Sequence, residues 1–180
     1  MIELEKILRN VKYDDIEYPV DQWQPEDCGL DGFRINRFGD WFFQDSQIKR
    51  HSLVVLLSKL LRKEGKQYYV VSPVEKIRVD VDCYPFCILL AEQKHDSGEE
   101  SWVLTLNTGA TIILGPEHPL SLYHDEQFSV QLPKVKVRGD LFAAVNRNVY
   151  YQWVSAASQR GNNLIIKSCQ CEFQLNADEI

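Results

Sequence analysis

The sequence predicts an α+β protein with two similar subdomains, each a mostly antiparallel sheet packed on one helix, preceded by an N-terminal helix and an extended arm. Three observations support this fold class. Short runs of alternating apolar and polar residues, bounded by turn residues, indicate many strands. A chain of 180 residues with 44% hydrophobic and 26% charged residues can bury a sizeable core. Finally, the order strand–helix–strand–strand occurs twice.

Residues 1–30 are predicted to form the N-terminal helix and arm. Residues 1–11 carry apolar side chains at helical spacing, which favours a short amphipathic helix. Residues 12–30 lack periodicity and contain two prolines, so we expect an extended segment. Three large apolar side chains indicate that this arm packs on the body of the protein: Tyr18, Val20 and Trp23.

The first subdomain is predicted to span residues 31–100. A strand at 31–37 is followed by a turn and by a returning strand that begins at Trp41. Leucines at helical spacing from Leu53 to Leu61 form one buried stripe, which predicts a helix. The helix is expected to end near Gly65, after the cations Arg62 and Lys63 of its last turn. Strands are then expected at 68–72, 74–80 and 85–93.

The second subdomain is predicted to span residues 101–180. Its first element is a hairpin that turns at Thr108-Gly109-Ala110. A second helix is expected at about 147–160, because apolar side chains from Val149 to Ala157 lie on one face. The other predicted strands are 120–123, 128–132, 135–138, 141–145, 164–167 and 172–175.

The strand–helix–strand–strand order of residues 41–79 recurs in residues 141–175. The two helices superpose at an offset of one hundred residues, which places Leu53 on Trp153. Sequence identity between the copies is low, so coincidence of a common pattern is the alternative explanation. Two related halves predict a crevice between them, and crevices between subdomains are common ligand sites.

Charge and composition exclude several classes of protein. A net charge of −6 disfavours nucleic-acid binding, which needs a basic face. No stretch approaches 18 apolar residues, so we expect no membrane span, and the acidic N-terminus is unlike a signal peptide. The odd number of cysteines, five, is typical of reduced thiols in the cytoplasm.

No standard catalytic motif is present, and the sequence therefore predicts neither an enzyme nor a cofactor. Phosphate-binding glycine loops, G-x-S-x-G and H-E-x-x-H are all missing, and no histidine has a metal-ligand spacing from another. The cysteines at 83 and 87 suggest zinc only weakly, and packed thiols are favoured. Asp80 and Asp82 share one strand face, which is either solvated or able to bind a cation or do acid–base chemistry.

The segment Ser72-Pro73-Val74-Glu75-Lys76 carries the most informative charges. Glu75 and Lys76 point to opposite faces of a strand, so one of them turns toward the core side or a crevice. A charge on that side needs a partner, because an unpaired buried charge is costly. Arg50 or Arg147, at the starts of the two equivalent helices, could pair with Glu75, either as a structural salt bridge or as part of a ligand site.

Several stretches together resemble a bacterial family catalogued as domain of unknown function 1285. The resemblance spans about residues 19 to 175 and is carried by Pro19–Pro25, Gly39–Phe42, Tyr69–Lys76, Glu117–Leu120 and Arg147–Tyr151. The chain departs from the family at Asp45-Ser46-Gln47, where the family tends to have glycine and proline, so a turn there could differ. The resemblance implies a two-subdomain α+β fold of repeated motifs. It also implies a ligand-binding or signal-transduction role without catalytic residues.

We therefore predict a cytoplasmic, non-enzymatic ligand-binding or regulatory module with its site between the two halves. Arg50 and Arg147 could hold a small anionic ligand by bidentate hydrogen bonds. The expected site residues are Arg50, Glu75, Lys76, Arg138, Arg147 and Tyr150.

Two alternatives remain open, and the sequence leaves the oligomeric state undefined. The first is a module that binds a protein partner through an exposed aromatic patch drawn from Trp23, Trp41, Trp102, Trp153 and the eight tyrosines. The second is an enzyme of unrecognised type, which would require Asp80, Asp82 and His51 to converge in a pocket.

Overall fold

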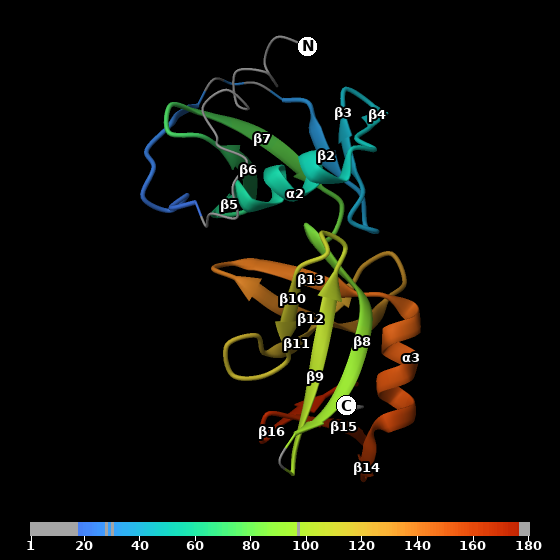
Figure 1. Ribbon diagram of the computed structural model, residues 1–180. Coiled ribbons are helices and arrows are strands. Elements are labelled where there is room, and N and C mark those ends of the chain that lie inside the picture. Colours follow the sequence, from blue (N-terminus) through green and yellow to red (C-terminus); the bar gives the residue numbers. More distant parts are fainter. Residues whose placement is uncertain (1–17, 28, 30, 97, 177–180) are drawn as a thin grey trace. The chain divides into compact units, whose positions relative to one another are not determined.

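The computed structural model describes residues 18–176, apart from residues 28, 30 and 97 (Figure 1). The helix predicted at 1–11 lies outside the described residues. The chain divides between Cys83 and Tyr84 into two compact units. The predicted boundary at residue 100 is wrong, because the strand before it pairs with strands of the C-terminal unit. No helix in the described part of the chain has the length and apolar character needed to cross a membrane.

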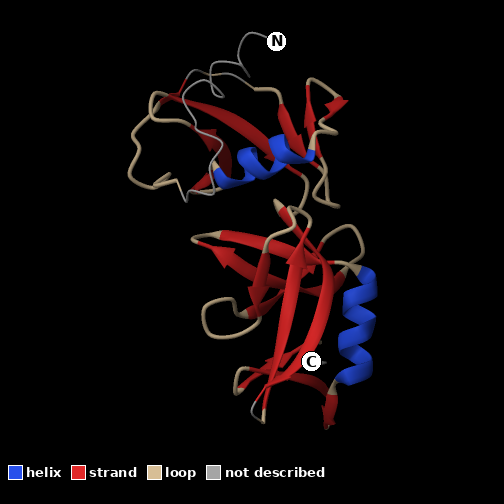
Figure 2. Cartoon of the chain, viewed as in Figure 1, coloured by secondary structure: helices blue, strands red, loops and turns tan. Residues whose placement is uncertain are grey.

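In its described residues, the N-terminal unit consists of a mixed sheet and the helix α2 (Figure 2). The order of its strands is β4-β3-β2-β7-β6-β5, and β1 also pairs with β7. Strand β7 holds the sheet together because it pairs in parallel with β2 and β1 and antiparallel with β6. The elements are β1 (Glu26–Asp27), β2 (Phe33–Ile35), β3 (Trp41–Phe43), β4 (Ser46–Gln47), α2 (His51–Lys59), β5 (Leu61–Glu64), β6 (Gln67–Val71) and β7 (Glu75–Val81).

The leucine stripe of the first predicted helix is divided between two elements. Leu56 and Leu57 are buried in α2, as the spacing predicts. The helix ends at Lys59, and Leu61 instead begins β5, where it pairs with Val70 of β6. Leu61 is fully buried in the strand, so its apolar side chain is removed from water as it would be in the predicted helix. Helical spacing alone therefore overestimated the length of this helix.

The described part of the arm packs on the N-terminal unit. Val20 is buried, and the rings of Tyr18 and Trp23 lie 6.2 Å apart. The Arg62 guanidinium Nη1 donates to the backbone oxygens of Val20 and Trp23 at 2.7 and 2.8 Å. Arg62 of β5 thus ties the arm to the sheet.

The C-terminal unit contains two sheets and the helix α3. A six-stranded sheet has the order β10-β9-β8-β13-β12-β11, and a three-stranded sheet has the order β14-β15-β16. The elements are β8 (Phe86–Asp96), β9 (Glu99–Leu106), β10 (Thr111–Ile113), β11 (Leu120–Asp125), β12 (Val130–Arg138), β13 (Leu141–Val145), α3 (Arg147–Ala156), β14 (Ser158–Arg160), β15 (Asn163–Ser168) and β16 (Cys171–Gln174).

Two predicted elements of this unit differ in the structure. The strands expected at 128–132 and 135–138 are one strand, β12, which runs through Pro133. Pro133 lies opposite Leu122 of β11 and just before the residues of β12 that pair with β13. The helix expected to reach residue 160 ends at Ala156, because Ala157 takes an extended conformation. Residues after it form β14 and pair with β15.

The order of a helix followed by strands recurs in both units, but the strands join their sheets differently. In the N-terminal unit, β5, β6 and β7 belong to the same sheet as the strands before α2. In the C-terminal unit, β14, β15 and β16 form a sheet of their own. The repeat is therefore one of element order, whereas the hydrogen-bonded topology of the two units is different.

The six-stranded sheet is curled. Strands β10 and β11 lie at its opposite edges, although only residues 114–119 connect them. A short connection between the two edges requires the sheet to bend back on itself. Its inner face is apolar and buried, and α3 adds Trp153, whose ring lies edge-on to Trp102 at 6.3 Å. Fully buried residues of this face include Ile88, Leu104, Val135 and Ala143.

Ser168, at the end of β15, joins the small sheet to the large one. Its side chain is fully buried. The hydroxyl donates to the backbone oxygen of Leu114 at 2.6 Å and accepts from the backbone nitrogen of Trp102 at 2.9 Å. The next residue, Cys169, donates its backbone N–H to the Glu100 oxygen at 2.9 Å. The end of β15 is therefore fixed against β9.

The turn that follows Ser168 is strained. Cys169 and Gln170 have φ values of 50° and 60°, in the left-handed region that glycine or asparagine usually occupies in two-residue hairpin turns. Such strain persists where the surroundings hold it in place, and it is often found near functional sites. Here the bonds of Ser168 and Cys169 hold the turn.

We predict that Ser168→Ala destabilises the protein by about 2 to 4 kcal/mol, because it leaves two buried backbone groups without their partner. Urea unfolding measures this change. The control is Ser155→Ala, which removes an exposed hydroxyl bonded within α3 and should change stability by less than about 0.5 kcal/mol. Equal effects of the two variants would contradict the role given to Ser168.

Candidate functional site

The predicted site residues of the N-terminal unit are structural in part. Arg50 is the exposed N-cap of α2, and its Nε donates to Ser52 at 3.1 Å. The backbone N–H and oxygen of Glu75 both bond to the Ser72 hydroxyl, at 3.0 and 3.1 Å. Within the described chain, Glu75 and Arg50 form no ion pair with each other. The Ser72-Pro73 segment is therefore a turn closed by the serine side chain.

Lys76 is the charge that needed a partner, and the partner is Glu64. The Lys76 ammonium donates to Glu64 Oε2 at 2.7 Å and lies 4.6 Å from the centre of the Tyr69 ring. The Arg62 guanidinium donates to the other oxygen of Glu64. The hydrogen bond from Lys76, followed by the bond and charge of Arg62, lowers the pKa of Glu64. In turn, the hydrogen bond to Glu64 raises the pKa of Lys76.

We predict that part of the stability of the N-terminal unit is lost at acidic pH. Because the pKa of Glu64 in the folded protein is below its ordinary value of 4.5, ionised Glu64 stabilises the fold above that pH. This contribution disappears as the pH falls from 4.5 through the lower folded value. Unfolding measured between neutral pH and about pH 3 should show a smaller acid-dependent loss for Glu64→Gln than for the wild type.

The control for this prediction is Glu75→Gln, which breaks no ion pair described in the structure. Its acid-dependent loss should match that of the wild type. A loss in Glu64→Gln that equals the wild-type loss would show that the Arg62–Glu64–Lys76 cluster does not stabilise the fold.

Two of the three predicted site residues of the C-terminal unit come together at the start of α3. Arg147 donates from Nε to the Tyr151 hydroxyl at 3.2 Å, and its guanidinium lies 5.3 Å from the centre of that ring. The ring of Tyr150 lies 6.0 Å from that of Tyr151. Arg138 is at the end of β12, beside the turn at Gly139. That the six predicted residues form one site stays a prediction.

Asp80, in β7, and Asp82, just after it, are both solvent-exposed. Arg34 makes two hydrogen bonds to Asp82, at 3.2 and 3.1 Å, and Asp80 is paired with Arg78 at 3.5 Å. His51 is exposed at the start of α2. Across residues 18–176, with the gaps given above, no group of three or more potential ligands is placed to hold a metal ion. The two aspartates are thus engaged with arginines of their own sheet.

Three of the four tryptophans belong to the cores. Trp41, Trp102 and Trp153 are no more than 2% exposed, and Trp23 is half-buried. An exposed aromatic patch built on these rings is therefore excluded. The large exposed hydrophobic side chains of the C-terminal unit include Leu90, Ile113 and Tyr151.

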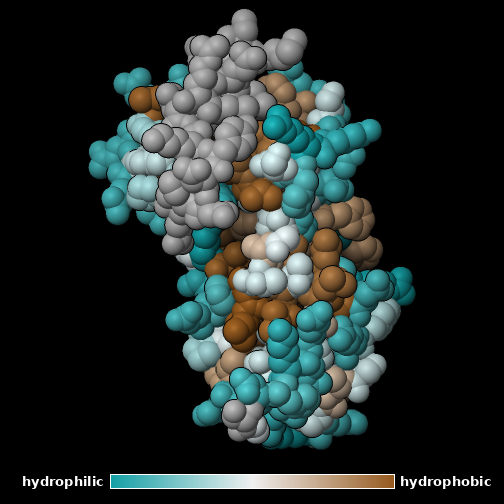
Figure 3. All heavy atoms as spheres, viewed as in Figure 1, coloured by the Kyte–Doolittle hydropathy of each residue, from teal (hydrophilic) through white to brown (hydrophobic). Residues whose placement is uncertain are grey.

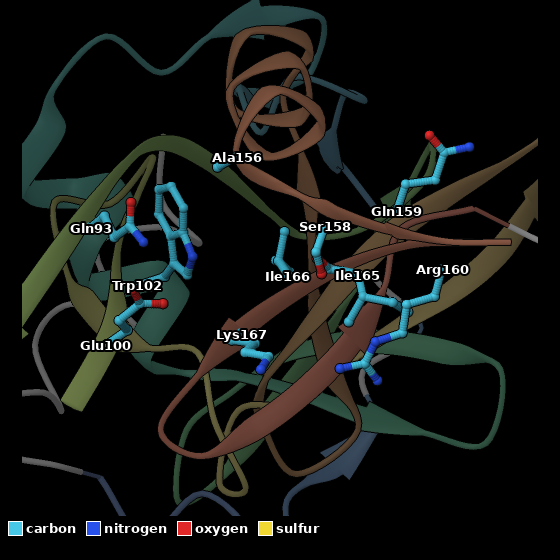
Figure 4. A pocket seen from close by; sticks show the side chains of 10 residues that line it. All are labelled: Gln93, Glu100, Trp102, Ala156, Ser158, Gln159, Arg160, Ile165, Ile166 and Lys167. Atoms are coloured by element: carbon cyan, nitrogen blue, oxygen red, sulfur yellow. The ribbon is translucent and has the colours of Figure 1, made fainter. Parts of the chain in front are cut away.

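A groove of about 340 Å³ lies in the C-terminal unit, between the β8–β9 hairpin and the small sheet (Figure 4). Gln93 and Trp102 are paired across β8 and β9 and point to the same face, as do Ser158 and Ile165 across β14 and β15. The floor is apolar and the rim is polar. The floor consists of Trp102, Ala156, Ile165 and Ile166, and the rim of Gln93, Glu100, Ser158, Gln159, Arg160 and Lys167.

A second hollow of about 390 Å³ shares two residues with the groove. It lies between the turn of the β8–β9 hairpin and the strained turn after β15. Glu100 and Lys167 line both hollows. The other residues that line the second hollow are Gly98, Glu99 and Gln170. Glu100 and Lys167 therefore stand where the two hollows meet.

The charged side chains on the rim of the groove differ in how closely they are paired with other charges. Arg160 makes two hydrogen bonds to Glu172, at 2.6 and 2.7 Å, and these bonds lower the pKa of Glu172 and raise that of Arg160. Lys167 is 3.5 Å from Glu172, and Glu100 is 3.7 Å from His95. Lys167 therefore shares Glu172 with Arg160 and keeps further N–H donors for a ligand, and the Glu100 carboxylate keeps acceptor capacity.

The sequence did not predict this groove, because no local motif marks it. Its walls come from the β8–β9 hairpin, α3, β14 and β15, and only the tertiary structure brings these together. Two incorrect predictions also concealed it. The boundary predicted at residue 100 placed Gln93 and Trp102 in different subdomains, although they are paired across β8 and β9. The second helix was predicted to continue to residue 160, so the strand β14 was not recognised.

The fold and groove define a class of protein: a two-unit α+β protein whose C-terminal unit carries a small, open groove. The family models identify it further. The model described as "Domain of unknown function (DUF1285), N-terminal domain" matches residues 18–83, and "Protein of unknown function (DUF1285), C-terminal domain" matches residues 85–175. The chain belongs to the DUF1285 family, as the resemblance in its sequence indicated, and the two matched regions meet at the boundary between the units.

Two crystal structures are similar to this chain. A DUF1285 family protein from Silicibacter pomeroyi DSS-3 is 28% identical, with a TM-score of 0.87 over 97% of this chain and 95% of that one. A DUF1285 family protein from Shewanella baltica OS155 is 20% identical, with a TM-score of 0.54 over 70% of this chain and 92% of that one, and this likeness shows the fold alone. Comparison with curated proteins gives no match.

Proposed function

We propose that the protein is a non-enzymatic ligand-binding or regulatory module, and that the groove of its C-terminal unit is the ligand site. The observation that carries this proposal is the combination of an apolar floor and a polar rim in one groove of about 340 Å³. Small-molecule sites have this composition, and their volumes begin at about 300 Å³.

The floor and rim would contribute different parts of the binding energy. The side chains of Ile165 and Ala156 offer an apolar surface to the body of a ligand, backed by the buried Trp102 and Ile166. The side chains of Gln93, Ser158 and Gln159 offer neutral hydrogen-bonding groups around it. This arrangement supports binding of a compact molecule with a partly apolar body.

The Arg160–Glu172 pair beside the groove favours a binding role over acid–base catalysis. A general acid or base works best with a pKa near the operating pH. The paired Glu172 beside the groove has a pKa lowered by Arg160, so it stays ionised at neutral pH and serves to position Arg160. A carboxylate held in this way orients a binding group and is a poor proton carrier.

We predict that Ala156→Phe abolishes ligand binding in the groove, because the added ring occupies space at the end of α3. Indole signals of the ¹⁵N-labelled full chain report binding during a screen of small metabolites, since Trp102 lines the groove. Hits should shift the Trp102 signal in the wild type and leave it unchanged in Ala156→Phe.

The matched control is Ala110→Phe, which adds an exposed ring in the turn between β9 and β10, outside the groove. It should bind as the wild type does. If Ala156→Phe binds the hits as tightly as Ala110→Phe does, the ligand site is not this groove.

A second candidate function, a protein-interaction module, is supported by the outer face of the β8–β10 strands. Leu90 and Ile113 are 61% and 50% exposed, and Val103 lies between their strands on the same face. Figure 3 shows hydrophobic residues gathered on the surface of this unit. This candidate predicts that Leu90→Lys with Ile113→Lys removes proteins that co-purify with the wild-type chain. An unchanged set of co-purifying proteins would exclude this face as an interface.

A further inference from the structure

We propose that the ligand of the groove is a small zwitterion of the α-amino acid type, with its ammonium group at Glu100, its carboxylate at Lys167 and an apolar side chain on the floor. This inference rests on the function proposed above and names the chemical class of its ligand. It follows from the charges of the two walls, from their freedom to bind, and from the apolar surface between them.

The two walls present opposite charges. Glu100 and Trp102 come from β9 on one wall, and Lys167 comes from β15 on the other (Figure 4). Glu100 and Lys167 line the same groove without forming an ion pair with each other in the described chain. A molecule with separated ammonium and carboxylate groups can bridge them, each group meeting a charge of opposite sign.

Both charged groups are available to a ligand. The Lys167 ammonium carries three N–H donors, and its nearest charged neighbour in the described chain, Glu172, is at 3.5 Å and already accepts two bonds from Arg160. The Glu100 carboxylate is 3.7 Å from the ring of His95, beyond hydrogen-bond distance. A ligand can therefore bond to the Glu100 carboxylate and to the N–H donors of Lys167 that do not face Glu172.

A ligand of a single charge fits the groove less well. An anion drawn to Lys167 would lie near the carboxylates of Glu100 and Glu172, and a cation drawn to Glu100 would lie near Lys167 and Arg160. Like charges in contact oppose binding and give specificity against such ligands. Only a molecule carrying both charges meets an attractive partner on each wall.

The apolar floor of the groove indicates the side chain of the ligand, which is its third part beside the ammonium and carboxylate groups. Ile165 and Ala156 give the groove its accessible apolar surface, and the buried Trp102 and Ile166 lie against it. An apolar side chain of a few carbon atoms would cover this surface, as expected for hydrophobic contact. The probe that matches all three parts is an amino acid with an aliphatic side chain, such as L-leucine.

The experiment is an NMR and calorimetric titration of the full-length protein with L-leucine and two analogues that each lack one charge. N-Acetyl-L-leucine keeps only the carboxylate, and L-leucinamide keeps only the ammonium group. L-Leucine should bind at least about tenfold more tightly than either analogue, because each analogue loses one charge-assisted hydrogen bond. Equal affinities for all three compounds would overturn the proposal.

Two substitutions assign the charges to their residues. Glu100→Gln should weaken the binding of L-leucine by about tenfold or more without weakening that of N-acetyl-L-leucine. Lys167→Gln should likewise weaken the binding of L-leucine without weakening that of L-leucinamide. Glu92→Gln and Lys94→Gln are matched controls, because these residues lie on the opposite face of the same hairpin and are exposed. They should bind L-leucine as the wild type does.

The result also separates this inference from the proposed function. If metabolites from the screen bind in a way that Ala156→Phe abolishes, but L-leucine does not bind, the groove is a ligand site and the zwitterion is wrong. If no metabolite shifts the Trp102 signal and L-leucine does not bind, both proposals fail.

Discussion

The C-terminal unit depends on one buried hydroxyl, that of Ser168. The curled six-stranded sheet leaves backbone groups of β9 and of residue 114 without a neighbouring strand, and unpaired backbone groups are costly to bury. Ser168 satisfies one donor and one acceptor at this place, and Cys169 adds a third bond. Because these bonds fix the end of β15 against β9, they set the spacing of the two walls of the groove. The strained turn at Cys169 and Gln170 is a consequence of the same attachment.

The charges of the two units serve different purposes. In the N-terminal unit, Arg62 and Lys76 are both paired with Glu64, and Arg62 also binds the arm. In such a half-buried charge cluster, removal of one member leaves the others without a charge partner. In the C-terminal unit, Arg160 and Glu172 are engaged with each other, whereas Glu100 and Lys167 keep their hydrogen-bonding capacity. The charges of the N-terminal unit are used within the fold, whereas Glu100 and Lys167 can still bond to a ligand, and this difference distinguishes a structural cluster from a candidate binding site.

Sequence patterns predicted the architecture better than the site. Period-two alternation found the hairpin of β9 and β10 and the strands on both sides of α3, and the family motifs indicated two units. The leucine stripe predicted a helix that is longer than α2, because Leu61 is buried equally well as a strand residue. The end of α3 was missed because Ala157 carries no glycine or proline signal. The groove could not be predicted, because its polar, aliphatic and aromatic side chains form no local motif and only the contact between two sheets brings them together.

The central claim is that the groove of the C-terminal unit holds a small molecule, and native mass spectrometry of the full-length protein tests it most directly. Protein purified gently from cells should carry a single added mass of no more than a few hundred daltons, in keeping with a groove of about 340 Å³. That mass should be released on collisional activation of the folded protein. A population with the mass of the polypeptide alone, unchanged after incubation with a metabolite extract, would contradict the claim.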